Sequence, residues 1–276
     1  MGDKSAIEWT DATWNPITGC HKVSEGCKFC YAERITERWG QDFRKIILHP
    51  NRLELPLRWK KPRRVFVNSM SDLFHEDIPV EFLADVFAVM HEAWSHTFQV
   101  LTKRAEYMAR TLRSAGFWDL VRIAQQHRTD RHGGILMEAR NPLSNVWLGV
   151  SVENQDRANE RIPWLIRTPS AVRFLSVEPL LGFVDLASWL PFGAGPLPLP
   201  PPEMHYAHNP LGIHWVIVGG ESGGPPERAL VEPGGWLAKE QALMWVLNLR
   251  NQCQAAAVPF FFKQWGGLVS HSGGRI

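Results

Sequence analysis

The sequence predicts an α/β fold built on a parallel β-sheet, and three observations support this prediction. Short apolar runs typical of strands alternate with segments of helical periodicity about seven times along the chain. The apolar runs are continuous, as expected for strands that are buried on both faces of a parallel sheet. Polar or charged residues follow these runs, which in α/β proteins marks the edge of the sheet that carries the functional site. Both an α/β barrel and an open doubly wound sheet fit this pattern.

The individual elements follow in order from the same periodicities. An extended piece lies within residues 7–19, and a helix with a charged face is expected at 31–40. Further strands are predicted at 65–68, 98–104, 145–150, 172–177, 214–218 and 258–262, with helices at 80–95, 105–125, after Asn154 and at 236–256. We expect a single domain over residues 1–276. It has two loop insertions, a polar one near 126–144 and one rich in proline and glycine near 187–212.

The composition is that of a folded protein without a membrane segment. Hydrophobic residues make up 45% of the chain, and no apolar run approaches the roughly 20 residues that span a bilayer. The first residues lack an apolar signal region, so we expect a cytoplasmic protein. A net charge of +2 permits a nucleic-acid partner without requiring one. The basic segment 41–64 is either a solvated connection or a contact for substrate phosphates.

Three of the four cysteines lie in one short segment, as Cys20, Cys27 and Cys30 with the spacing C-x6-C-x2-C. Three thiolates in one loop can hold a single metal centre, either zinc or an iron–sulfur cluster. An odd number of cysteines without a secretion signal argues against disulfides. The sequence shows no fourth ligand nearby, which favours a reactive centre with an open position over a closed structural zinc site. The remaining cysteine, Cys253, is expected to be a buried thiol on a helix.

The second half of this loop resembles that of the radical S-adenosylmethionine (SAM) superfamily, in which an aromatic residue precedes the last cysteine of a C-x3-C-x-aromatic-C loop. The first spacing here is longer by three residues. The chain is most similar to the spore photoproduct lyase-like branch and to a phage-encoded family of uncharacterised proteins named for a three-cysteine motif. The phrases that carry the resemblance are WNPITGC at 14–20, NSMSDLF at 68–74, LTKR at 101–104, GVSVE at 149–153, SVEPL at 176–180, GGESG at 219–223 and FKQWG at 262–266.

The resemblance implies a partial (β/α)6–7 TIM-like barrel with parallel strands. It also implies an enzyme in which the three cysteines bind a [4Fe–4S] cluster and the open iron binds SAM. Contacts to the SAM amino group are implied for Asn68, Ser69, Met70 and Asp72, where the superfamily usually has Gly-Gly-Glu. Contacts to the SAM ribose are implied for Ser151, Glu153 and Asn154. The implied partners are SAM and a one-electron donor such as flavodoxin or ferredoxin.

Four further residues at strand ends are predicted to act on the substrate: Lys103, Glu178, Glu221 and Lys263. The lysines suit a carboxylate or a phosphate, although salt bridges to Glu178 or Glu221 would explain them equally well. The substrate class stays open, and a nucleic-acid base or nucleotide is favoured by the resemblance.

The alternative is a protein of a different class. The cysteines, with His21 or His75 as fourth ligand, would hold zinc and stabilise a nucleic-acid-binding or phage-associated interaction protein without catalysis. The charged residues gathered at the strand ends argue against it, because a scaffold has no need of them. A metal-dependent hydrolase would need His and Asp clusters that the sequence lacks.

Overall fold

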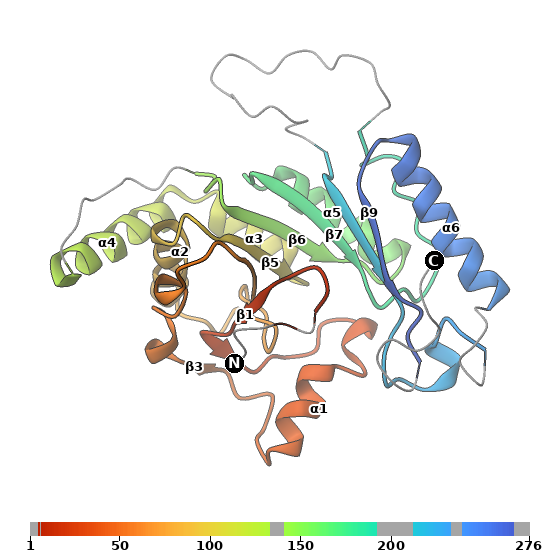
Figure 1. Ribbon diagram of the computed structural model, residues 1–276, viewed down its shortest axis with the longest axis horizontal. Coiled ribbons are helices and arrows are strands. Elements are labelled where there is room, and N and C mark those ends of the chain that lie inside the picture. The colour runs from red at the N-terminus through yellow and green to blue at the C-terminus, as the bar shows by residue number, and fades with distance from the viewer. Residues whose placement is uncertain (1–4, 6, 133–140, 192–211, 233–238, 268–276) are drawn as a thin grey trace. The chain divides into compact units, whose positions relative to one another are not determined.

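The computed structural model describes residues 5, 7–132, 141–191, 212–232 and 239–267, in which strands and helices alternate along the chain (Figure 1). These residues form two compact units. Unit 1 contains residues 1–22, 32–149 and 168–171, and unit 2 contains residues 23–31, 150–167 and 172–276. The expectation of a single domain stays a prediction. Part of the first predicted insertion, 133–140, and most of the second, 192–211, lie outside the described residues.

The main sheet has seven strands in the order β1-β4-β5-β6-β7-β8-β9. Once the separate β2–β3 pair is set aside, each strand follows its neighbour in the sequence. The pairs β1–β4, β4–β5, β7–β8 and β8–β9 are all parallel. A doubly wound sheet reverses its direction at a switch point, whereas strands of a (β/α) barrel pair in sequence order. The fold is therefore α/β with a parallel sheet of the partial TIM-barrel type, as predicted.

Unit 1 is built on three parallel strands: β1 (Ala12–Trp14), β4 (Arg64–Val67) and β5 (Thr97–Thr102). Val65 lies opposite Ala12 on one side and Phe98 on the other, and all three side chains are buried. The apolar run of β4 is continuous because both faces of the strand are covered.

The basic segment 41–64 contains short ordered elements before β4. They are β3 (Ile47–Leu48), which pairs antiparallel with β2 (Ile17–Thr18), and the 3-10 turns η2 (Pro50–Arg52) and η3 (Pro56–Arg58). The indole of the fully buried Trp14 donates to the carbonyl of Arg52 at 2.8 Å, which ties the segment to β1.

The helices of unit 1 are α1 (Tyr31–Arg38), α2 (Val80–Glu92), α3 (Ala105–Leu112) and α4 (Ala115–His132), and α2 packs against α4. One helix was predicted over 105–125, but the structure has two, because α3 ends at Leu112 and α4 begins at Ala115. The carbonyl of Leu112 accepts a hydrogen bond from the Trp118 indole at 2.8 Å. Residues 126–132, predicted to be loop, continue α4. Ion pairs from the buried Arg128 to Glu92 and Glu54 fix that polar end of the helix.

The strand β6 (Val146–Ser151) is divided between the units, with Val146–Gly149 in unit 1. The other elements of unit 2 are α5 (Gln155–Arg167), β7 (Val172–Val177), β8 (Trp215–Gly219), η4 (Pro226–Arg228), α6 (Glu240–Ala255) and β9 (Phe260–Gln264). Figure 1 shows α6 alongside β9. The last strand begins two residues later than predicted and includes Lys263. The later start and end of this strand accompany a shift in the register of the β8–β9 pair between Val218 and Gly219, where Gly219 pairs with Gln264.

None of the helices among the described residues combines the length and the apolar character that a bilayer crossing requires.

Cys253 lies on α6 with no exposed surface, as predicted, and burial raises the pKa of its thiol to about 12. The other three cysteines form no disulfide among the described residues and are only partly buried. Because the thiolate is the reactive form, we expect a neutral alkylating reagent to modify Cys20, Cys27 and Cys30 but not Cys253 in the folded, chelator-treated protein. Peptide mass spectrometry reads out the sites, and all four cysteines should react in denaturant. Equal labelling of Cys253 in the folded protein would contradict this burial.

Candidate functional site

The three-cysteine segment runs from the end of β2 to the start of α1. Cys20 belongs to unit 1, Cys27 closes the 3-10 turn η1 (Glu25–Cys27), and Cys30 directly precedes α1. Gly19 sets the backbone before Cys20. Its φ is +93°, and a Cβ at this position would lie 2.1 Å from the carbonyl oxygen of Lys45, so only glycine fits. The amide of Cys20 then donates to the carbonyl of Phe43 at 2.8 Å.

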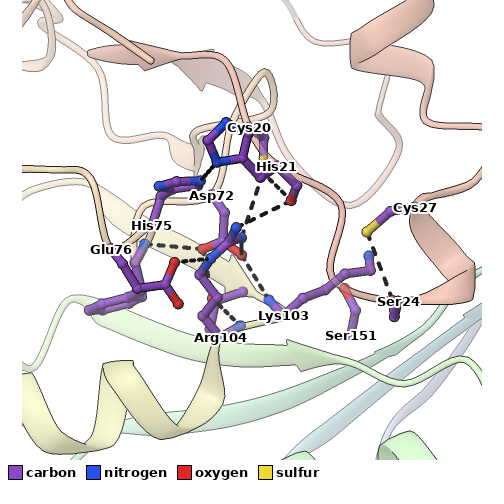
Figure 2. Close-up of polar contacts among 12 residues, drawn as sticks. Cys20, His21, Ser24, Cys27, Asp72, His75, Glu76, Lys103, Arg104 and Ser151 are labelled. Atoms are coloured by element: carbon purple, nitrogen blue, oxygen red, sulfur yellow. Dashed lines mark hydrogen bonds and ion pairs between the residues drawn. The ribbon is translucent and has the colours of Figure 1, made fainter. Parts of the chain in front are cut away.

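Arg104, two residues after the C-terminal end of β5, contacts Cys20. Its Nη1 donates to Cys20 Sγ at 3.6 Å and to Asp72 Oδ2 at 3.3 Å, and its Nη2 donates to the carbonyl of His21 at 3.2 Å (Figure 2). Its Nε donates to Glu76 at 2.7 Å. Burial acts to lower the pKa of Arg104, but the charges of Asp72, Cys20 and Glu76 outweigh it, so the pKa is raised. A permanent cation therefore lies against a predicted ligand thiol.

Asp72, predicted to contact SAM, is an anchor within unit 1. Its Oδ1 accepts hydrogen bonds from the Thr102 hydroxyl at 2.6 Å and the Phe74 amide at 3.0 Å. Its Oδ2 accepts the Lys103 amide at 3.0 Å as well as Arg104. The carboxylate thus joins the turn after β4 to the end of β5, and it places Lys103 and Arg104 directly beside that turn.

Asn68 differs from the other residues implied to contact SAM. It is 3% exposed and has a φ of +59°, and neither atom of its side-chain amide finds a hydrogen-bond partner among the described residues. The neighbouring groups are engaged: the Ser69 hydroxyl bonds the Asn15 amide, and the Met70 amide donates to Asn15 Oδ1 at 3.1 Å. Asn15, which the sequence analysis did not single out, therefore holds residues 69 and 70, while Asn68 keeps its hydrogen-bonding capacity.

His21, His75 and Asp77 form the one group of potential metal ligands whose atoms gather within 4.8 Å among the described residues. The Asp77 amide donates to His75 Nδ1 at 3.1 Å, so the ring proton must lie on Nε2, which then donates to His21 Nδ1 at 2.9 Å. Desolvation, reinforced by Arg104, lowers the pKa of His75 and keeps it neutral near pH 7. Both ring nitrogens of His75 are thus engaged, and the group fits a hydrogen-bonded pair of imidazoles better than zinc ligands.

In unit 2, the segment before Cys27 is held by Glu153, which has no exposed surface. Its carboxylate accepts hydrogen bonds from Arg161 Nη1 at 2.9 Å and from the Ser24 hydroxyl at 2.8 Å. Arg161 also donates to the carbonyl of Ser151 at 2.9 Å. A Cβ on Gly26 would lie 2.4 Å from the Glu153 side chain, so the backbone approaches this carboxylate as closely as glycine permits.

Two further networks of unit 2 surround the same segment. Asn154 and Arg157 bond the Glu25 carboxylate, whose pKa is lowered chiefly by a hydrogen bond from its own backbone and then by these two side chains, against the opposing effect of burial. Arg228 donates to the carbonyl of Glu25 at 3.0 Å and to both oxygens of Glu221, at 2.6 and 2.9 Å. Its guanidinium also lies 5.1 Å from the centre of the Phe29 ring.

Three of the four residues predicted to act on the substrate, Glu178, Glu221 and Lys263, form ion pairs in the structure. Lys263 Nζ lies 2.6 Å from Glu178 Oε1, which is the salt bridge that the sequence analysis considered an equally good explanation. Glu221 is paired with Arg228. Lys103 belongs to unit 1 and the other three belong to unit 2.

Sequence analysis missed the arginines that organise these carboxylates, Arg104 and Arg161. Arg104 lies inside one of the phrases that carried the resemblance, and Arg161 lies on a helix next to other charged residues. Spacing alone gave no sign of either role, since Arg104 contacts Cys20 across 84 positions of sequence.

We expect Gly26→Ala to destabilise the protein by about 1–3 kcal/mol, because the added methyl group overlaps a carboxylate that Arg161 and Ser24 hold in place. Chemical denaturation of the metal-free protein measures the change. Gly182→Ala is the matched control, because the atom nearest to a Cβ at this position is the Asn154 Cβ at 3.6 Å, an ordinary van der Waals contact. Equal stability of the two variants would show that the Glu153 contact leaves room for a side chain.

A family model described as protein of unknown function (DUF5131) matches residues 4–275. Comparison with curated proteins and with solved structures gives no significant match. Because the family match covers nearly the whole chain, the protein belongs to the DUF5131 family.

Proposed function

We propose that this protein is a radical SAM enzyme whose Cys20, Cys27 and Cys30 hold a [4Fe–4S] cluster. The cluster would supply the one-electron reduction that cleaves SAM to methionine and a 5′-deoxyadenosyl radical, the species that abstracts hydrogen from the substrate. The observation that carries the proposal is the C-x6-C-x2-C segment, with an aromatic residue before its last cysteine, in a chain with a parallel sheet of the partial TIM-barrel type.

The chemistry of the donor set fits the cluster. None of the three cysteines forms a disulfide among the described residues, and cysteine thiolates are the usual ligands of iron–sulfur clusters. The loop backbone is fixed on both sides of the first spacing by glycines that no other residue can replace without a clash, Gly19 and Gly26. Arg104 adds an N–H donor aimed at one sulfur, Cys20 Sγ. Hydrogen bonds of this kind are among the features by which proteins tune such centres.

The side-chain amide of Asn68, which is buried without a hydrogen-bond partner among the described residues, supports the proposal that a polar ligand binds next to the turn after β4. A buried polar group without a partner costs about 1–3 kcal/mol, and a ligand that supplies the missing bonds removes this cost. The left-handed backbone of Asn68 adds strain of the kind found at binding sites. An amide offers both donors and an acceptor, which suits the amino and carboxylate groups of SAM.

Substrate binding is assigned to the ion-paired side chains Glu178, Lys263 and Glu221, together with Lys103. A nucleic-acid base or nucleotide is the proposed substrate class, supported by the exposed basic residues Arg58, Lys60 and Lys61 of the segment before β4. A flavodoxin or ferredoxin is the proposed electron donor.

Protein purified without oxygen and reconstituted with iron and sulfide tests the cluster. We expect a brown protein with about four irons per chain that bleaches on reduction and releases 5′-deoxyadenosine from SAM. Replacement of the three cysteines by serine should abolish the iron content and the colour.

A colourless protein that binds one zinc through these cysteines, and that neither takes up a cluster nor cleaves SAM, would contradict the proposal. It would favour the zinc-stabilised binding protein.

We expect Asn68→Gly to weaken SAM binding roughly tenfold or more, in line with the loss of one or two hydrogen bonds. Glycine accepts the left-handed φ of +59° without strain, so this variant removes the amide while leaving the backbone undisturbed. Equilibrium binding of SAM to the cluster-loaded protein is the measurement, and the iron content of the variant is the control. Unchanged SAM affinity at full iron content would remove Asn68 from the binding site.

A further inference from the structure

Among the arginines of the described residues, Arg104 is distinguished by a combination of three properties. Its side chain is 4% exposed, it touches a cysteine sulfur, and its guanidinium bonds two carboxylates, those of Asp72 and Glu76 (Figure 2). All of these groups belong to unit 1. The two carboxylates differ in solvent access, since the side chain of Asp72 is 8% exposed and that of Glu76 is 56% exposed.

We propose that Arg104 is a positioning residue that raises the reduction potential of the metal centre at Cys20, and that Asp72 moderates this effect. The inference rests on the proposed function, because it requires a cluster bound at Cys20. It concerns a single event, the gain of one electron by the oxidised cluster, in which no atom or proton is exchanged.

The sign follows from electrostatics. Reduction adds one negative charge to the cluster, and a buried cation that donates an N–H to a ligand sulfur stabilises the reduced form more than the oxidised form. The low effective dielectric around a buried guanidinium strengthens this effect. The carboxylate of Asp72, 3.3 Å from Nη1, opposes it without solvent screening, whereas the charge of Glu76 is largely screened by water. The two buried groups should therefore shift the potential in opposite directions.

A purely structural role would give a different pattern. Arg104 also donates to the carbonyl of His21 at 3.2 Å, so it fixes the backbone beside Cys20. If anchoring were its whole function, substitution would lower the stability or the cluster occupancy. The potential of the clusters that remain would not move in a direction set by charge.

The experiment is a redox titration of the reconstituted full-length protein with dithionite in the absence of SAM, followed by electron paramagnetic resonance. We expect Arg104→Met to shift the midpoint potential to more negative values. Arg104→Lys should give a smaller negative shift, because an ammonium keeps the charge but cannot reproduce the planar fork of donors. Asp72→Asn should shift the potential to more positive values. Arg128→Lys is the matched control, since Arg128 is an equally buried arginine with two carboxylate partners, Glu54 and Glu92, and it should cause no shift.

The outcomes separate this inference from the proposed function. Wild-type protein that takes up no cluster overturns the proposed function and the inference with it. A cluster whose potential is the same in wild type, Arg104→Lys and Asp72→Asn overturns the inference alone. If Arg104→Met fails to fold or to hold iron, the midpoint potentials of Arg104→Lys and Asp72→Asn test the inference. Shifts of opposite sign support the role of Arg104, and shifts of the same sign overturn it.

Discussion

Buried arginine–carboxylate pairs are the interactions on which the cysteine segment depends. In unit 1 the Arg104–Asp72 pair reaches Cys20 and His21, and in unit 2 the Arg161–Glu153 pair reaches Ser24. Removing one member of such a pair leaves the other charge buried without compensation, which typically costs 3–5 kcal/mol. Replacing both members by apolar side chains would avoid that cost, but it would also remove the donors and acceptors that the segment uses. The pairs therefore contribute more to the geometry of the segment than to the stability of the fold.

Two glycines make this geometry possible, for different reasons. Gly19 adopts a backbone conformation that other residues rarely reach, and it lies against the Lys45 carbonyl. Gly26 has no such backbone requirement, and its constraint is the side chain of Glu153. A loop that met only the backbone requirement would still tolerate a small side chain at residue 26. The backbone at Gly26 also packs closely against the buried carboxylate of Glu153. A buried, hydrogen-bonded network of this kind favours a single conformation of the loop.

Much of the fold could be predicted from the sequence, because the signals are local. The continuous apolar runs located every strand of the main sheet after β1 within about two residues, and 172–177 was predicted with both bounds correct. Where prediction failed, distant partners decided the outcome. The polar end of α4 is helical because Arg128 pairs with Glu54 and Glu92, and the break before α4 involves the indole of Trp118. Neither contact leaves a periodic pattern in the sequence.

The site shows the same division between local and distant signals. Sequence position identified the strand ends correctly, but it could not tell which polar side chains the protein uses for its own contacts. Asp72 and Glu153 are saturated by Thr102, Arg104, Ser24 and Arg161, and the Ser24–Glu153 contact spans 129 positions of sequence. Asn68 is the exception among the residues implied to bind SAM, because its amide is buried and unbonded within the described part of the chain. The charged groups around Asn68 have partners, and leaving its amide without hydrogen bonds adds nothing to the stability of the fold. Hydrogen-bonding capacity left in a strained and buried residue is therefore what the proposed ligand would use.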